Sequence, residues 1–184
     1  MSKKLAVYLA EGFEEGEAIV PMDIAIRAGI EVTMISISDS RTVTGSHGIP
    51  ITADKVMSET DDREYDMLML PGGMPGTANL EGNSAVGEAL KRAKADGRYI
   101  AAICAAPRYL GDLGLLDGEK ATVYPGNEGH LKGASYDPAA KSVISGKVVT
   151  ARGMGCAVEF GRDIAACLVG GDKAAEILAS IQYN

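Results

Sequence analysis

One cysteine stands where an apolar run is predicted to pass into a helix. In the stretch IAAICAAPRYLGDLG, which spans residues 100–114, Cys104 precedes Pro107, a residue suited to a first helical turn. The free N–H groups and the positive dipole end of a helix start favour a thiolate. Burial as a small hydrophobic residue is the common alternative for a cysteine. The stretch alone leaves Cys104 open between a nucleophile and a packing residue.

Two further loops carry groups that suit thiolate chemistry. Gly72 and Gly73, in LPGGMPG, offer consecutive backbone N–H groups at a strand end, which is typical of an oxyanion hole and also of a plain turn. Glu17, at a helix start, is placed where its carboxyl can turn toward Cys104. Two such groups do not comfortably ionise together. We therefore expect a shared proton, a raised pKa for Glu17 and a hydrogen bond from Glu17 to the thiolate.

The remaining candidate residues have weaker signals. His47 and His130 fall in loops, where a histidine is more often solvated than catalytic. Arg152 either orients the crevice or pairs with a carboxylate, and Cys156 and Cys167 are interpreted as packing residues. Three cysteines and two histidines at wide spacing fit neither a disulfide framework nor a zinc site. We expect no metal and no cofactor.

The elements that position these residues alternate between strands and helices. A glycine-bearing stretch predicts a β-hairpin over 41–54. Apolar runs predict buried strands over 4–10, 31–38, 66–70, 99–103, 120–124 and 147–151. Helical spacing of apolar residues predicts four helices, over about 15–28, over 84–96, along a stripe from Phe160 to Leu168 and along 174–181. Asn83 is the expected cap and Gly97 the expected stop of the second helix, and Asp172 is the expected cap of the fourth.

This alternation indicates a mostly parallel sheet with helices on both faces. The ligand-binding loops of such a sheet lie beyond the carboxyl ends of its strands. Five loops are therefore predicted to converge on one crevice, namely EGFEEGE, PGGMPG, the turn at Cys104, YPGNEGH and RGMG.

Composition limits the function classes. With 184 residues, 46% of them hydrophobic, the chain is predicted to form a single domain over 1–184 with a real core. A net charge of −7 argues against nucleic acid as the partner. No run approaches the roughly 18 apolar residues of a membrane span, and the first apolar run is too short for a signal peptide. We expect no membrane partner and a cytoplasmic location.

The chain resembles the ThiJ/PfpI superfamily, within the clade of the parkinsonism-associated deglycase DJ-1. The resemblance covers about 5–170 and lies in AEGFEEGEAIVPMDIAIRAGI, YDMLMLPGGMPGTANL, IAAICAAP and VVTARGMG. It implies a flavodoxin-like three-layer α/β sandwich of the class I glutamine amidotransferase-like type, usually a homodimer.

The resemblance also implies a site. Cys104 falls on the family's reactive cysteine at a nucleophile elbow, and Glu17 falls on its protonated glutamate. The backbone donors beside the thiolate fall on three positions, Gly72, Gly73 and Ala105.

Three positions depart from the family pattern. Tyr124 stands after the fifth strand, where dimeric members commonly carry a histidine base; a phenol can only donate a hydrogen bond or orient a carbonyl near neutral pH. His47 occupies the position from which a hairpin arginine reaches the partner's site. Ala105 stands where the protease-like branch has a histidine, which weakens a peptidase interpretation.

Three functions remain open. The first is a cofactor-free enzyme of glyoxalase III or deglycase type, in which the Cys104 thiolate adds to a small aldehyde or a glycated protein and Glu17 shuttles the proton. The second is a non-enzymatic redox-sensing or chaperone-like homodimer whose cysteine is oxidised to sulfinate. The third is cysteine hydrolase or amidotransferase-like acyl chemistry, which Tyr124 in place of histidine disfavours.

Overall fold

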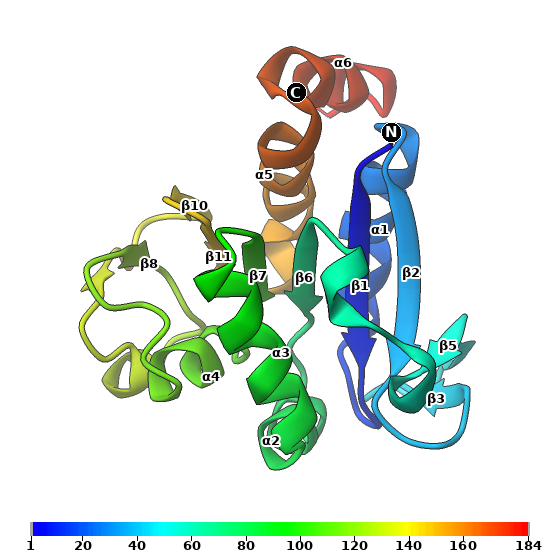
Figure 1. Ribbon diagram of the computed structural model, residues 1–184. Coiled ribbons are helices and arrows are strands. Elements are labelled where there is room, and N and C mark those ends of the chain that lie inside the picture. Colours follow the sequence, from blue (N-terminus) through cyan, green and yellow to red (C-terminus); the bar gives the residue numbers. More distant parts are fainter. Residues whose placement is uncertain (1, 184) are drawn as a thin grey trace.

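A seven-stranded sheet forms the middle of the molecule in the computed structural model, which describes residues 2–183 (Figure 1). Its strands are β1 (Lys4–Leu9), β2 (Glu31–Ser36), β5 (Lys55–Val56), β6 (Met67–Leu70), β7 (Tyr99–Ile103), β10 (Ser142–Ser145) and β11 (Val148–Ala151). Their order is β10-β11-β7-β6-β1-β2-β5, and all neighbours run parallel except β10 with β11. The predicted parallel sheet is confirmed.

Two small ribbons lie apart from this sheet. Strands β3 (Thr42–Thr44) and β4 (Pro50–Thr52) form the predicted hairpin, and β8 (Lys120–Ala121) pairs with β9 (Ser135–Tyr136). The prediction of a sheet strand over 120–124 is wrong: only Lys120–Ala121 form a strand, and that strand belongs to the small ribbon with β9. The backbone N–H of Thr122 binds the Thr150 hydroxyl at 3.0 Å and that of Tyr124 binds the Cys104 carbonyl at 2.7 Å, so neither joins a strand ladder.

Helices cover both faces of the sheet. They are α1 (Glu15–Arg27), α2 (Gly76–Gly82), α3 (Ser84–Ala95), α4 (Pro107–Asp112), α5 (Ala157–Val169) and α6 (Gly171–Ser180). Asn83 caps α3 as predicted, because its side chain accepts from the Ala85 N–H. The predicted cap at Asp172 is wrong. Helix α6 already begins at Gly171, and Gly170 takes the capping position at φ +98°, a conformation that favours glycine.

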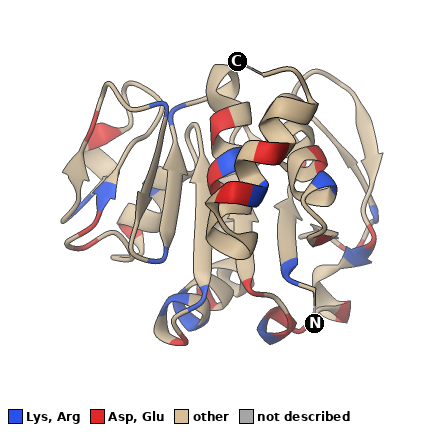
Figure 2. Ribbon diagram, turned by 90° about the horizontal axis from the view of Figure 1, so that it is seen from above, with Lys and Arg blue, Asp and Glu red and all other residues tan. Residues whose placement is uncertain are grey.

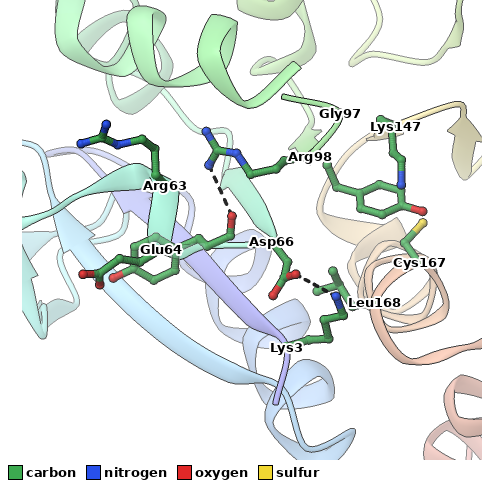
Figure 3. Close-up of a pocket in the computed structure, with 11 residues that line it drawn as sticks. Lys3, Arg63, Glu64, Asp66, Gly97, Arg98, Lys147, Cys167 and Leu168 are labelled. Atoms are coloured by element: carbon green, nitrogen blue, oxygen red, sulfur yellow. Dashed lines mark hydrogen bonds and ion pairs between the residues drawn. The ribbon is translucent and has the colours of Figure 1, made fainter. Parts of the chain in front are cut away.

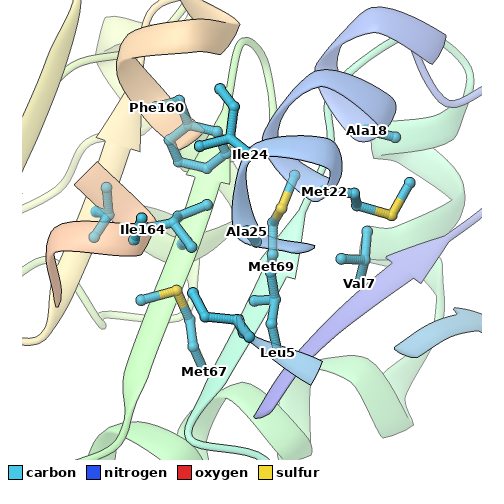
Figure 4. Close-up of a cluster of buried hydrophobic side chains, with 14 of the residues drawn as sticks. Leu5, Val7, Ala18, Met22, Ile24, Ala25, Met67, Met69, Phe160 and Ile164 are labelled. Atoms are coloured by element: carbon cyan, nitrogen blue, oxygen red, sulfur yellow. The ribbon is translucent and has the colours of Figure 1, made fainter. Parts of the chain in front are cut away.

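Side chains of β1 alternate between two cores. Leu5, Val7 and Leu9 pack toward α1 and α5, whereas Ala6 and Tyr8 pack toward α2, α3 and α4. Figure 4 shows the first of these clusters, with helix α1 and strand β6 contributing to it. The two-residue period of a strand thus fastens a helical layer to each face, and each fully buried large side chain contributes about 1.5–3 kcal/mol. The predicted three-layer α/β fold is confirmed.

The strand order also fixes where a crevice lies. Among the strands β1, β2, β6, β7 and β11, taken in chain order, the spatial order is 2-1-3-4-5, which is the flavodoxin-like arrangement. The chain leaves β1 toward β2 on one side and returns to β6 on the other. The carboxyl ends of β1 and β6 therefore border the switch point at which such sheets bind ligands.

The surface carries both signs of charge. The helices that face the viewer in Figure 2 bear Lys and Arg segments beside Asp and Glu segments. Within residues 2–183, the helices are all too short or too polar to cross a bilayer.

Candidate active site

Cys104 sits on a sharp turn between β7 and α4. Its φ of 64° lies in the left-handed region, which residues other than glycine rarely adopt. Its N–H donates to the Ala151 carbonyl at 2.9 Å, and its carbonyl accepts from the Tyr124 N–H at 2.7 Å. The ends of two neighbouring segments thus hold the cysteine in this conformation.

Glu17 approaches the cysteine from the first turn of α1. Glu14 caps that helix, since its carboxylate accepts from the Glu17 N–H at 2.6 Å. The Glu17 residue is only 1% exposed. Its Oε2 accepts from the Gly72 N–H at 3.0 Å, and its carboxyl also bonds the Met154 N–H and the Cys104 thiol. The carboxyl is buried with polar partners on several sides.

The pKa values of both groups are raised. Burial raises the pKa of Glu17 to about 7, and the Glu14 charge adds to this, while hydrogen bonds from Cys104, Gly72 and Met154 oppose it. Burial, followed by the charge and the hydrogen bond of Glu17, raises the pKa of the Cys104 thiol to about 12. The lowering expected from a helix start is outweighed by burial of the thiol and by the Glu17 carboxyl beside it.

The pair therefore holds two protons below about pH 7 and one proton above it. Below about pH 7 both groups are neutral, and above it they share a single negative charge. The N–H groups of Ala105 and Gly73 point at the sulfur and favour thiolate, whereas the Gly72 N–H favours a Glu17 carboxylate. Because backbone N–H groups stabilise a negative charge on either atom, the proton can move between the Glu17 oxygen and the Cys104 sulfur during a reaction.

The five predicted loops do converge, and close packing holds them together. A Cβ on Gly72 would lie 2.5 Å from Glu17 Oε2 and 2.6 Å from Cys104 Cβ. Gly73 has φ +92°, and a Cβ there would collide with the Glu14 N–H. Both positions therefore need glycine to bring backbone donors beside the cysteine and the glutamate.

The histidines lie elsewhere. His47 Nδ1 is 2.8 Å from Glu15 Oε2, and this hydrogen bond raises the pKa of the exposed His47. His130 Nδ1 is 2.7 Å from Asp112 Oδ2. Within residues 2–183, neither imidazole is paired with Cys104.

Two other predicted residues contribute differently from expectation. Tyr124 gives its backbone N–H to the elbow, while its half-exposed ring packs over Gly153. Arg152 donates from Nη1 to the Pro138 carbonyl at 3.0 Å and, among the described residues, pairs with no carboxylate. Neither side chain therefore supplies a base for the thiol.

Some functional groups escaped the sequence reasoning. The N–H of Met154 and the carbonyl of Ala151 carry no side-chain signal, and they act only because the fold brings β11 beside the elbow. Glu14 had a signal, because it precedes Glu17 by three residues, the spacing of a helix cap and its N3 position. Its role is to fix Glu17 and to raise the pKa of that carboxyl.

One group of side chains has the chemistry of a metal site. Ligand atoms of Glu14, Glu15 and His47 lie within 4.8 Å of one another. Glu15 already accepts from the His47 ring and its N–H, and Glu14 caps α1. These bonds account for the arrangement as an anchor of the hairpin on α1.

Comparisons with known proteins agree with this geometry. The family model described as the DJ-1/PfpI family matches residues 3–167. Protein DJ-1 homolog B of Arabidopsis thaliana is 38% identical over 96% of the chain, which spans only 40% of that relative. Protein dj-1beta of Drosophila melanogaster is 36% identical over the full length of both chains, and its crystal structure superposes with a TM-score of 0.95 at 35% identity and full coverage of both chains. Oxidized Toxoplasma gondii DJ-1 superposes with a TM-score of 0.92 at 36% identity over 99% of each chain.

Proposed function

The chain belongs to the DJ-1/PfpI family, and from that premise we propose that it is a single-domain, cofactor-free cysteine enzyme acting on small reactive carbonyl compounds. The observation that supports this most directly is the hydrogen bond between Cys104 and the buried Glu17 carboxyl, with backbone N–H groups beside both side chains. The proposal places the activity in the cytoplasm, where the three free cysteines stay reduced.

The first proposed step is addition of the Cys104 thiolate to the aldehyde carbon of methylglyoxal. A sulfur–carbon bond forms, the C=O electron pair moves to oxygen, and that oxygen takes the proton from Glu17. The N–H groups of Gly73 and Ala105 face the sulfur, where they stabilise the negative charge before and during attack. The product is a hemithioacetal.

The second step uses the same carboxyl as a base. The Glu17 carboxylate takes the proton from the former aldehyde carbon and returns it to the neighbouring carbon, while the hydroxyl proton of the hemithioacetal moves to the neighbouring oxygen. The first carbon becomes the thioester carbonyl and is oxidised, and the second becomes a hydroxyl-bearing carbon and is reduced. The resulting lactate thioester is hydrolysed by water, which frees lactate and the Cys104 thiol. Methylglyoxal and water thus give lactate without an external oxidant. On a glycated protein, the same site would free the amine or thiol in a deglycase reaction.

Lactate formation from methylglyoxal tests the proposal. We expect the wild-type protein to form lactate, with a rate that increases as pH passes about 7. The Cys104→Ser variant should fall to the uncatalysed background, while Cys167→Ser, a matched change at another partly exposed thiol, should stay within about twofold of wild type. Background rates for wild type would contradict an enzymatic function.

A redox role is the second candidate. Within residues 2–183 no imidazole is paired with the thiol, and oxidation by peroxide needs none. Thiolate and one peroxide give sulfenate and water, and a second peroxide gives sulfinate and water. Mass spectrometry after mild peroxide should then find two added oxygen atoms on Cys104 before Cys156 or Cys167. Equal oxidation of the three cysteines would contradict this role. Hydrolase or amidotransferase chemistry gains no comparable support.

We also propose that the protein acts as a homodimer. An apolar groove of about 460 Å³ runs along α1, β2 and β4, and Ile26 at its side is 60% exposed. Covering it with a second copy would bury Ile19 and Ile26 and bring the neighbouring hairpin, with His47, toward the partner. Light scattering should give a dimer for wild type and a monomer for Ile26→Glu, with Ile144→Glu, an exposed change on β10, remaining dimeric.

A further inference from the structure

A second groove, of about 790 Å³, opens beside the cysteine–glutamate pair and has no part in the reaction proposed above. Two of its lining residues also bond the pair through their backbones. Tyr124 donates its N–H to the Cys104 carbonyl, and Met154 donates its N–H to the Glu17 carboxyl. Through these two backbones the groove borders the pair, although neither Cys104 nor Glu17 is part of its lining.

Part of the groove's lining is apolar. The Tyr124 residue is 52% exposed and the Met154 residue 56% exposed, although both are large and hydrophobic. Met154 covers the first turn of α1, where a Cβ on Gly16 would lie 3.1 Å from its Cγ. Tyr136 and Pro125 extend the lining. Exposed apolar side chains gathered beside a reactive thiol are typical of a surface that binds the apolar body of a ligand.

The lining also carries a cation whose N–H groups are not all used. Arg152 uses one N–H for the Pro138 carbonyl and, among the described residues, meets no carboxylate. The other cation of the lining, Lys141, is committed to Glu159 at 2.5 Å, and Glu128 is the acid of the lining. A guanidinium has five donors, and its geometry suits a carboxylate.

We propose that this groove binds the body of a carbonyl substrate larger than methylglyoxal. The substrate class is an α-oxoaldehyde with an aromatic or branched apolar body and a carboxylate at its far end. The aldehyde faces Cys104, the body lies on Tyr124 and Met154, and the carboxylate pairs with Arg152. Tyr124 then contacts the apolar body of the substrate and contributes to substrate specificity. The reaction at the aldehyde rests on the proposed function, whereas binding of an aromatic carboxylate in the groove does not depend on it.

A ratio of rates tests the substrate class. The probes are 4-carboxyphenylglyoxal and methylglyoxal, compared by kcat/KM from initial rates. We expect wild type to favour the aromatic acid by about tenfold or more, and Arg152→Gln to reduce that ratio by about tenfold, since one ion pair with a ligand of this size is worth about a factor of ten. Arg152→Lys, which keeps the charge, should retain most of the ratio. Arg162→Gln, on α5 and paired with Asp163, is the matched control and should leave the ratio unchanged.

A binding measurement separates this inference from the enzymatic proposal. Titration of the Cys104→Ser protein with unreactive 4-methylbenzoate should show binding that weakens by about tenfold when Arg152→Gln is added. Binding with this dependence, together with a wild-type protein that turns over no α-oxoaldehyde, would support the groove and contradict the enzymatic proposal. Turnover of methylglyoxal without benzoate binding, or with equal loss of the ratio in Arg152→Lys and Arg152→Gln, would overturn the groove proposal.

Discussion

Cys104 and Cys167 are both free thiols that are neither fully buried nor fully exposed. Burial is the largest cause that raises the pKa of each, to about 12 for Cys104 and about 11 for Cys167. By burial and acidity alone the two cysteines are nearly alike. They differ in the hydrogen-bonding groups around the sulfur.

Charged side chains near Cys167 interact with groups other than its thiol. The thiol lies on α5 at a cavity of about 300 Å³ near the amino ends of β6 and β7 (Figure 3). Lys3 bonds Asp66 there at 2.8 Å, and Lys147 lies 4.0 Å from the centre of the Tyr99 ring. Among the described residues, burial and the charges of Asp163 and Lys147 account for the shift of the Cys167 pKa.

The surroundings of Cys104 are arranged for proton transfer. Its backbone is in a left-handed conformation, a carboxyl bonds its sulfur, and the N–H groups of Ala105 and Gly73 point at the same atom. A buried thiol becomes reactive when partners stabilise its charged form and exchange its proton, so burial alone does not select the reactive cysteine. Changes to these partners test the comparison.

The largest effect is expected for Glu17→Gln, which removes the charge but keeps the size. Turnover of methylglyoxal should fall by about 10²–10⁴, the usual contribution of a general acid–base group. Alkylation of Cys104 by iodoacetamide near pH 8 should instead become about tenfold faster or more, because the Glu17 charge no longer raises the Cys104 pKa. Labelling of Cys167 in the same sample is the control. A parallel fall in turnover and labelling would show that Glu17 only supports the fold.

Much of this arrangement follows from the sequence. Buried apolar runs predict the strand at 99–103 as the structure has it, and the parallel-sheet rule alone brings Glu17, Gly72 and Cys104 to one edge. The other features depend on contacts between residues far apart in the sequence, which local patterns do not predict. Thr122 leaves the predicted strand for a hydroxyl 28 residues away, and the Cys104 pKa depends on a burial that only the assembled fold creates.

The stability of the protein should also depend on Glu17. Its pKa in the folded state, about 7, exceeds the ordinary value of 4.5, so folding favours the neutral carboxyl. That contribution is complete below pH 4.5 and is lost as pH rises through about 7. Urea unfolding should show wild type losing about 2–3 kcal/mol relative to Glu17→Gln between about pH 5 and about pH 8. A pH-independent difference between the two proteins would contradict the raised pKa.

A smaller loss is expected when the loops are forced apart without changing any charge. In Gly72→Ala the new methyl group meets both Glu17 Oε2 and Cys104 Cβ, so the carboxyl and the sulfur must separate. Misplacement of reacting groups by about 1 Å can cost up to about a hundredfold in turnover. Gly82→Ala, whose Cβ would meet nothing within 4 Å, is the matched control. Full activity of Gly72→Ala would mean that close contact of the pair is unnecessary.

The smallest effect belongs to the other cysteine. The Lys147 charge lowers the pKa of Cys167, whereas burial and the Asp163 charge raise it. Lys147→Met should therefore slow iodoacetamide labelling of Cys167 by about threefold. The change is modest because the lysine is partly in solvent. High salt should slow wild type toward the variant by screening the same charge, whereas Cys104, whose partners are buried hydrogen bonds, should respond to neither change. Cys104 labelling that followed Lys147 or salt would mean that long-range charge governs both thiols. The distinction drawn from local hydrogen bonds would then be lost.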